Sequence, residues 1–232
     1  NPGGLLMEAV NICNIFIEKG MPVVETKGKI TQNNQVYKTT SSQVDKEIPL
    51  VILINRGSAS ASEIFAAAIQ DYKRGIIIGS TSTYGKGTVQ RNVPFGNPID
   101  YSTGRREFGA VKLTFQKFYR INGSSTQHKG VSPDIAFPMV FAADKYGESA
   151  EPAALPWDEI KRSNYKTLAN IAPIKRGLIE KHDKRMKGSK DFEHLLADIK
   201  ELKVRDAETT ATLNEGLAKK ERDEKEAESL AR

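Results

Sequence analysis

Residues 55–90 read NRGSASASEIFAAAIQDYKRGIIIGSTSTYGKGTVQ, and they hold a cluster of small residues and a Gly-Lys-Gly turn. The preceding residues 49–54 are continuously apolar, which is typical of a strand buried on both faces of a parallel sheet. Residues 61–72 are good helix formers with apolar side chains at helical spacing. Ser60 is therefore expected at the point where a strand turns into a helix.

A hydroxyl at position 60 would lie beside the unpaired N–H groups and the positive end of that helix. An oxyanion that forms there would be stabilised. Ser60 and Glu63 also fit the S-x-x-E capping box, in which both side chains only satisfy backbone donors. The serine alone therefore does not separate a nucleophile from a helix cap.

A second apolar run, residues 76–78, predicts another strand, and a polar loop leads from it to the Gly-Lys-Gly turn at Lys86. Extended geometry would place Lys86, Thr88 and Gln90 on one face. Two flanking glycines leave little room for water, which disfavours the charged form of the lysine. A neutral amine can act as general base towards Ser60, and the uncharged Gln90 could orient it.

A lysine between two glycines also fits a phosphate-binding loop or an ordinary surface loop. A phosphate-binding P-loop requires G-x-x-x-x-G-K-[ST], whereas five residues separate Gly79 from Gly85 and a glycine follows the lysine, so the spacing excludes it. An ordinary exposed loop lysine stays open on the residues alone.

Four strings carry a resemblance to a known family: GSASASEIFAAAIQDY at 57–72, GKGTVQ at 85–90, QKFYRINGSSTQHKGVSPDI at 116–135 and ALPWDEI at 154–160. They resemble the carboxy-terminal processing peptidases, which are Ser-Lys serine peptidases, and within them the tail-specific branch of Gram-negative bacteria. The resemblance implies an α/β, crotonase-like peptidase core followed by a C-terminal α-helical domain.

By motif position, the resemblance implies Ser60 as the nucleophile, Lys86 as the general base and Gln90 as the residue that assists the lysine. It assigns the oxyanion hole to the N–H of Ala61 and to the Gly-Gly pair at positions 3 and 4, without separating Gly3 from Gly4. On the residues alone, this glycine pair is more simply a turn that precedes a helix.

The resemblance also implies Glu63, Asp71 and Thr83 as residues that support activity. The segment GSTSTYGKG, residues 79–87, carries one residue more than is usual in the family before the lysine turn, which bears on the assignment of Thr83.

The activity implied by the resemblance is that of a serine endopeptidase that forms an acyl-enzyme on Ser60 and needs no cofactor. Its substrates would be periplasmic proteins or peptides chosen by apolar C-terminal tails, with a membrane-associated adaptor as a further partner. The first residues match the middle of the family motif D-L-R-N-N-P-G-G, so we expect a fragment that lacks the family's PDZ domain and can be inactive by itself. The alternatives are a non-catalytic protein-binding module and an acyl-CoA enzyme on the same fold.

The composition of the chain narrows the classes of function that remain possible. The net charge of +6 arises before residue 141, because residues 141–232 hold equal numbers of basic and acidic side chains. No Lys/Arg stripe interleaved with aromatics occurs, so nucleic acid is not an expected partner. The single cysteine, Cys13, lies in an apolar helical pattern and predicts a core residue. No metal-ligand spacing occurs, and His128 lies in a polar loop without a suitably spaced carboxylate.

The chain divides by composition into three parts. We expect the C-terminal part of a catalytic domain at 1–140, a linker at 141–162 and a helical domain at 163–232. Within the first part, the patterns predict a helix, a strand pair, a long loop and a strand, at residues 5–17, 21–48, 92–109 and 110–121 respectively.

Overall fold

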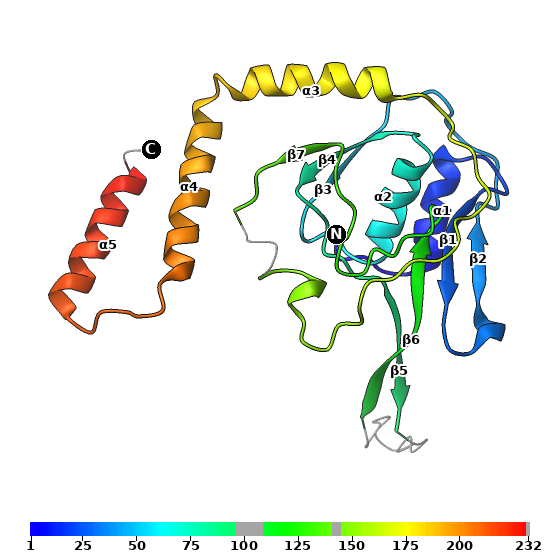
Figure 1. The fold of residues 1–232 in the computed structure, drawn as a ribbon, viewed down its shortest axis with the longest axis horizontal. Coiled ribbons are helices and arrows are strands. Elements are labelled where there is room, and N and C mark those ends of the chain that lie inside the picture. The colour runs from blue at the N-terminus through cyan, green and yellow to red at the C-terminus, as the bar shows by residue number, and fades with distance from the viewer. Residues whose placement is uncertain (96–108, 141–144, 231–232) are drawn as a thin grey trace, which may run out of the picture. The chain divides into compact units, whose positions relative to one another are not determined.

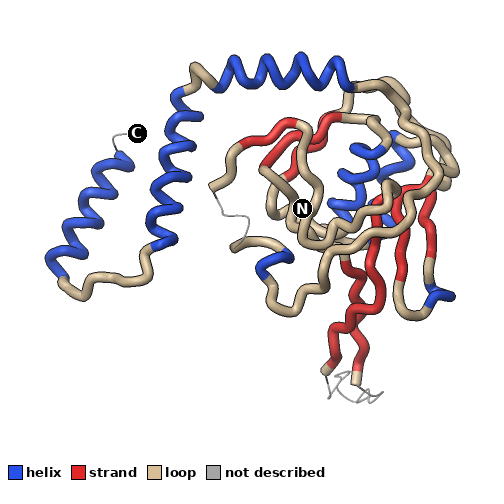
Figure 2. Tube along the Cα trace, viewed as in Figure 1, coloured by secondary structure: helices blue, strands red, loops and turns tan. Residues whose placement is uncertain are grey.

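The computed structural model describes residues 1–95, 109–140 and 145–230, and it contains two compact units, Asn1–Ser189 and Lys190–Arg232 (Figure 1). The first unit contains both helices and strands, whereas the second is helical (Figure 2). The expected α/β class is therefore confirmed. The expected domain boundaries stay a prediction.

One sheet of the first unit is parallel and has three strands, in the order β3-β4-β7. Its strands are β3 (Val51–Ile54), β4 (Ile76–Ser80) and β7 (Ile135–Phe137). Helix α2 (Ala61–Asp71) connects β3 to β4, and α1 (Leu6–Phe16) packs against α2. The strand-to-helix turn expected at residue 60 is therefore present.

An antiparallel sheet of four strands completes the first unit, in the order β2-β1-β6-β5. Strands β1 (Pro22–Lys27) and β2 (Gln35–Lys38) form the expected pair, with a short helix η1 (Thr31–Asn33) between them. Strands β5 (Thr88–Pro94) and β6 (Ala110–Arg120) form a long hairpin. This hairpin begins two residues after Lys86, so it continues directly from the lysine turn.

Two expectations about strands were wrong. Burial of β3 on both faces is contradicted, because Leu53 is 76% exposed and Val51 49% exposed. Val51 and Leu53 lie on the same face of β3, and the described residues leave that face uncovered, whereas Ile54 on the other face is buried. The long loop expected from residue 92 is contradicted for residues 92–94, which pair with β6. Residues 96–108 lie outside the described part of the chain.

The hydrophobic core of the first unit lies between the two helices and the sheets. Cys13 is fully buried there, as expected, and burial raises the pKa of its thiol to about 12. The other core residues are the apolar side chains of α1, α2, β1, β4 and the end of β6, which include Val10, Ile69, Tyr72, Ile77, Phe118 and Ile121. This core holds the N-terminal end of α2 in a fixed place.

The residues after 145 are mostly helical. A short helix η2 (Glu148–Ala150) and α3 (Ala172–Met186) belong to the first unit, and α4 (Lys190–Ala207) and α5 (Glu215–Leu230) to the second. Among the described residues, no helix is long and apolar enough to span a lipid bilayer.

Candidate active site

Ser60 lies directly before the first residue of α2, and its backbone is unusual. It has φ 54° and ψ −115°, a conformation that residues other than glycine rarely adopt. A sharp, strained strand-to-helix turn exposes the nucleophilic serine in α/β-hydrolases. The same local geometry is available to Ser60.

A buried carboxylate joins the serine turn to the lysine turn. Glu63 Oε2 accepts the N–H groups of Ser60 at 2.7 Å and Lys86 at 3.0 Å. Its Oε1 accepts the N–H of Gly85 at 2.7 Å and the hydroxyl of Thr83 at 2.5 Å. The two turns are 26 positions apart in the sequence, and this side chain fixes one against the other. The contact to the Ser60 N–H belongs to a capping box, so the cap and the site are not alternatives.

The protonation of Glu63 is set by two opposing effects. Its side chain is completely buried, and burial raises the pKa of the carboxyl to about 7. The hydrogen bonds from Thr83 and from the three backbone N–H groups oppose this rise, because they favour the charged form. Burial is the larger effect.

Lys86 and Gln90 make the contact that the sequence predicts. Lys86 Nζ donates to Gln90 Oε1 at 3.0 Å, and Gln90 Nε2 donates to Thr114 Oγ1 at 3.3 Å. Because the amide nitrogen is directed to Thr114, the amide oxygen faces the lysine. Gln90 can therefore hold the amine without adding a charge beside it.

One cavity of about 350 Å³ brings the expected chemical groups together, since Ser60, Lys86 and Gln90 all line it. Gly4 and Ala61 line the same cavity. Within the described residues, no direct hydrogen bond joins the Ser60 hydroxyl to the Lys86 amine. Catalytic hydrogen bonds often tighten only in the complex with substrate.

The structure distinguishes the two glycines that the sequence left unseparated. Gly3 has φ +97°, its N–H donates to Asn1 Oδ1 at 2.9 Å, and an added Cβ would lie 2.5 Å from the Ala59 oxygen. Only glycine fits so close to the serine turn. The N–H of Gly4 has no hydrogen-bond partner in the described part of the chain, and Gly4 lines the cavity. Gly4 is the better candidate for an oxyanion donor.

Asp71 is not brought to this cavity. It is the last residue of α2, roughly 16 Å along the helix from Ser60. Its carboxylate accepts two hydrogen bonds from Arg120, at 2.5 and 3.1 Å, and one from Asn122 at 3.1 Å. Burial raises the pKa of Asp71 above its ordinary value, and Arg120 opposes that rise. Asp71 therefore attaches α2 to β6.

Residues 125–128 also pack against the lysine turn, and the sequence did not predict this contact. Thr126 Oγ1 donates to the Lys86 carbonyl at 3.0 Å, and the His128 N–H donates to the Gly85 carbonyl at 2.8 Å. The only feature of the sequence that pointed to this segment was a polar run within the motif at residues 116–135. Such a run does not indicate which residues it contacts. His128 contributes its backbone to this turn.

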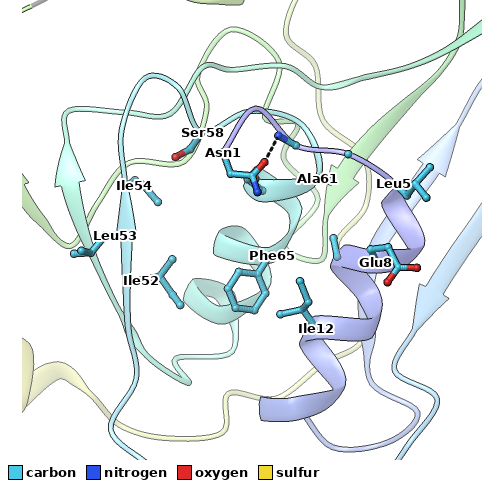
Figure 3. Close-up of a pocket in the computed structure, with 14 residues that line it drawn as sticks. Asn1, Leu5, Glu8, Ile12, Ile52, Leu53, Ile54, Ser58, Ala61 and Phe65 are labelled. Atoms are coloured by element: carbon cyan, nitrogen blue, oxygen red, sulfur yellow. Dashed lines mark hydrogen bonds between the residues drawn. The ribbon is translucent and has the colours of Figure 1, made fainter.

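A second cavity of about 350 Å³ shares Gly4, Leu5 and Ala61 with the first. Figure 3 shows the residues that line it. Most of its other lining side chains are apolar and come from α1, α2 and β3: Ile12, Ile52, Leu53, Ile54 and Phe65. The serine turn is thus bordered by apolar surface.

The groups at the first cavity are a hydroxyl, an amine, an amide and backbone N–H groups. This set supports acyl transfer by a nucleophile and a general base. Among the described residues, no group of three His, Cys, Asp or Glu side chains could hold a metal ion.

Comparison with known proteins gives matches along the whole chain. The model of peptidase family S41 matches residues 1–137, and that of the C-terminal domain of tail specific protease matches residues 141–232. The chain is 42% identical to the tail-specific protease of Haemophilus influenzae, over 99% of this chain and 33% of the relative. It is 41% identical to the carboxy-terminal-processing protease of Bartonella bacilliformis, over 58% of this chain and 28% of the relative.

Among solved structures, the photosystem II D1 C-terminal processing protease is 34% identical and covers 62% of this chain and 34% of its own, with a TM-score of 0.48. The chain spans about a third of the length of the curated relatives it matches.

Proposed function

The chain belongs to peptidase family S41, and we propose that it supplies the catalytic residues of a tail-specific serine endopeptidase. The observation that carries this proposal is that Ser60, Lys86 and Gln90 line one cavity although they come from the serine turn, the lysine turn and strand β5. Glu63 supports it further, because it ties the backbone of one turn to that of the other.

In the proposed reaction, Ser60 Oγ attacks the carbonyl carbon of the peptide bond while the neutral Lys86 amine takes the hydroxyl proton. The oxyanion lies against the N–H groups of Gly4 and Ala61. The tetrahedral intermediate collapses, the C–N bond breaks, and Lys86 returns the proton to the leaving amine. In the second half, water attacks the acyl carbon while Lys86 takes its proton; the bond between the acyl carbon and Ser60 Oγ then breaks, and Lys86 returns the proton to Ser60 Oγ.

The substrates would be proteins or peptides with apolar C-terminal tails. The names of the relatives, "tail-specific" and "carboxy-terminal-processing", support this choice. The cavity also has apolar lining, from Leu5, Leu6, Ile64, Val89 and Phe118. The proposal places the protein in the periplasm of a Gram-negative bacterium, with a membrane-associated adaptor as a further partner and without a cofactor.

Substitution of the two reacting residues tests the proposal in the full-length protein. Ser60→Ala and Lys86→Ala should each lower the rate of peptide cleavage by at least about 10³-fold. Lys86→Arg should fail as well, because a guanidinium does not deprotonate. Lys19→Arg, at an exposed lysine, is the matched control and should cleave like the wild type. Normal cleavage by Lys86→Arg would remove Lys86 from the mechanism.

A fluorophosphonate probe separates this proposal from the two alternatives. The probe reacts with an activated serine, so the wild type should be labelled at Ser60 and the Lys86→Ala protein should not. A protein-binding module or an acyl-CoA enzyme without a nucleophile would leave the wild type unlabelled.

A further inference from the structure

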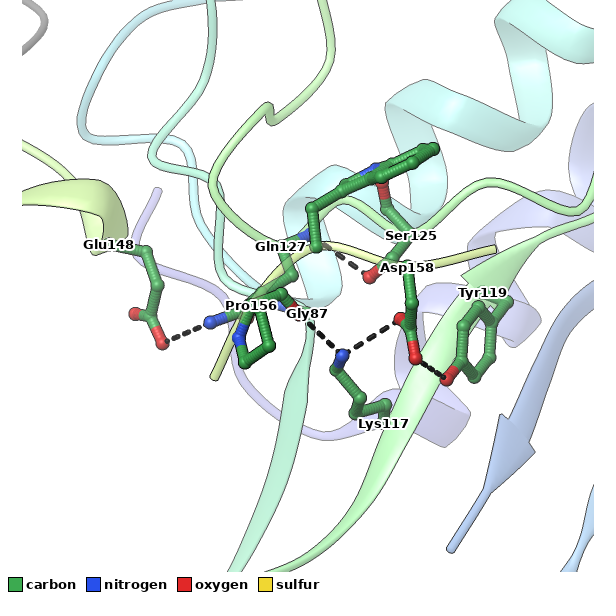
Figure 4. Close-up of polar contacts among 9 residues, drawn as sticks. Gly87, Lys117, Tyr119, Ser125, Gln127, Glu148, Pro156 and Asp158 are labelled. Carbon is green, nitrogen blue, oxygen red and sulfur yellow. Dashed lines mark hydrogen bonds and ion pairs between the residues drawn. The ribbon is translucent and has the colours of Figure 1, made fainter. Parts of the chain in front are cut away.

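Gln127 is fully buried, and both atoms of its side-chain amide are paired (Figure 4). Its Oε1 accepts the N–H of Gly87, directly after the lysine, at 2.8 Å. Its Nε2 donates to Glu148 Oε1 at 3.1 Å. The backbone N–H of Gln127 donates to Ser125 Oγ at 3.0 Å. Gln127 therefore connects the lysine turn to the helix η2.

The lysine turn lies so close to this segment that side chains are excluded. A Cβ added to Gly87 would lie 2.7 Å from the Gln127 nitrogen and 2.7 Å from Ser125 Oγ. One added to Gly85 would lie 3.0 Å from the backbone of His128. The path of the turn is therefore set by residues 125–128, and a shift of Gln127 would be transmitted to Lys86.

Glu148 contacts the lysine loop directly at Tyr84, before Lys86, and reaches Gly87, after Lys86, only through Gln127. Its N–H donates to the Tyr84 carbonyl at 3.0 Å, and its carboxylate accepts from the Gln127 amide. Glu148 lies outside the part matched by peptidase family S41 and inside the part matched by the C-terminal domain of tail specific protease. A region beyond the peptidase match thus contacts the elements that carry the proposed base.

Glu148 and the Gly87 N–H together determine which way the buried amide faces. The two ends of a Gln amide have nearly the same shape, but one accepts a hydrogen bond and the other donates. The Glu148 carboxylate only accepts and the Gly87 N–H only donates, so the nitrogen faces Glu148 and the oxygen faces Gly87. A reversed amide would bring two donors together at the Gly87 N–H, which is unfavourable in a buried place.

We propose that Glu148 is a positioning residue for Lys86, which it holds in place through the amide of Gln127. This inference rests on the proposed function, since it assumes that Lys86 is the base. It assigns a role in the geometry of the active site to the region that follows the peptidase match.

The test measures kcat and KM for peptide cleavage by the full-length protein. Glu148→Ala should lower kcat on the order of 10- to 100-fold, because small misplacements of reacting groups have effects of this size. The KM should stay within about twofold, since the apolar lining of the cavity is untouched. Glu148→Gln keeps an acceptor oxygen and should recover most of the lost kcat. Glu151→Ala, which removes the same charge three residues later, is the control and should be unchanged.

A double-substitution cycle tests whether the effect passes through Gln127. Gln127→Met removes the acceptor for the Gly87 N–H, so it should lower kcat by itself, and Glu148→Ala should then have no further effect. Should Glu148→Ala fail to fold, Glu148→Asp keeps the charge but shortens the reach, and it should show the same loss of kcat.

Three results would overturn the inference: a kcat for Glu148→Ala equal to that of Glu151→Ala, no recovery with Glu148→Gln, or losses that multiply in the double variant. The Ser60→Ala protein keeps this test separate from the proposed function. Cleavage by Ser60→Ala would refute the function itself, whereas an inactive Ser60→Ala with a normal Glu148→Ala would refute the positioning role alone.

Discussion

At the scale of single residues, Glu63 connects the fold to the proposed chemistry. A carboxylate in its position accepts four hydrogen bonds, and a protonated carboxyl cannot accept all of them, since one oxygen then carries a hydrogen. With a pKa of about 7, Glu63 changes its protonation near neutral pH. The hydrogen bonds between the serine turn and the lysine turn are therefore strongest above that pH, whereas the cost of burying the charge lowers the stability of the fold there.

This pKa predicts a pH dependence of stability. Glu63 has an ordinary pKa of 4.5 in the unfolded chain and a pKa of about 7 in the folded protein. At a pH between these two values, the folded protein keeps a proton on Glu63 that the unfolded chain has released. This contribution to the free energy of unfolding is complete below pH 4.5 and is lost as the pH rises through 7, with a size of about 3 kcal/mol. Urea unfolding from pH 4 to 8 measures it against Glu63→Gln, which does not titrate. Parallel curves for the two proteins would contradict the prediction.

At the scale of elements, α2 has a different function at each end. Its N-terminal end carries the serine turn, and its C-terminal end is fixed to β6 by the ion pair between Asp71 and Arg120. Both side chains of this pair are largely buried, with 6% and 12% exposure. Rigid attachment at the far end keeps the serine turn in place without any contact to the reacting groups.

We expect Asp71→Asn to affect stability and not chemistry. The substitution leaves the Arg120 charge largely buried without its partner, which should lower the free energy of unfolding by about 3 kcal/mol. Measured on the folded protein at low temperature, kcat should be unchanged. Ser60→Ala is the opposite control, since it should remove activity and keep stability. A stable Asp71→Asn protein with a much lower kcat would show that Asp71 takes part in the reaction.

The elements also show how far the sequence could predict this structure. Apolar runs predicted β3 and β4, because strand-forming residues at residues 51–54 and 76–78 are a local signal. The exposure of Leu53 was not predicted, since a run of apolar residues does not tell whether both faces of a strand are covered. Gln127 was missed because its partner Gly87 is 40 residues away, and no local pattern encodes that contact. The site residues came from motif position, and their roles stay predictions.

At the scale of the whole molecule, burial is distributed very unevenly along the chain. Nearly all buried apolar residues of the described chain lie between residues 9 and 135. In the second unit, Ile199 is buried, whereas Leu213 is fully exposed. Most helical stability in proteins comes from the packing of an apolar face, and among the described side chains of α4 and α5 only that of Ile199 is buried. The second unit should therefore open far more often than the first.

Hydrogen exchange measured along the intact protein tests this difference. The amide hydrogens of residues 61–72 should exchange only when the protein opens almost completely, because the apolar side chains of α2 are packed in the core. The free energy of this opening should be close to that of global unfolding. Peptides from residues 190–207 and 215–230 should exchange at nearly unprotected rates under the same conditions. Equal protection of α4 and α2 would contradict the prediction. It would mean that the apolar stripe of α4, formed by Phe192, Leu195, Ile199 and Leu202, is covered in solution.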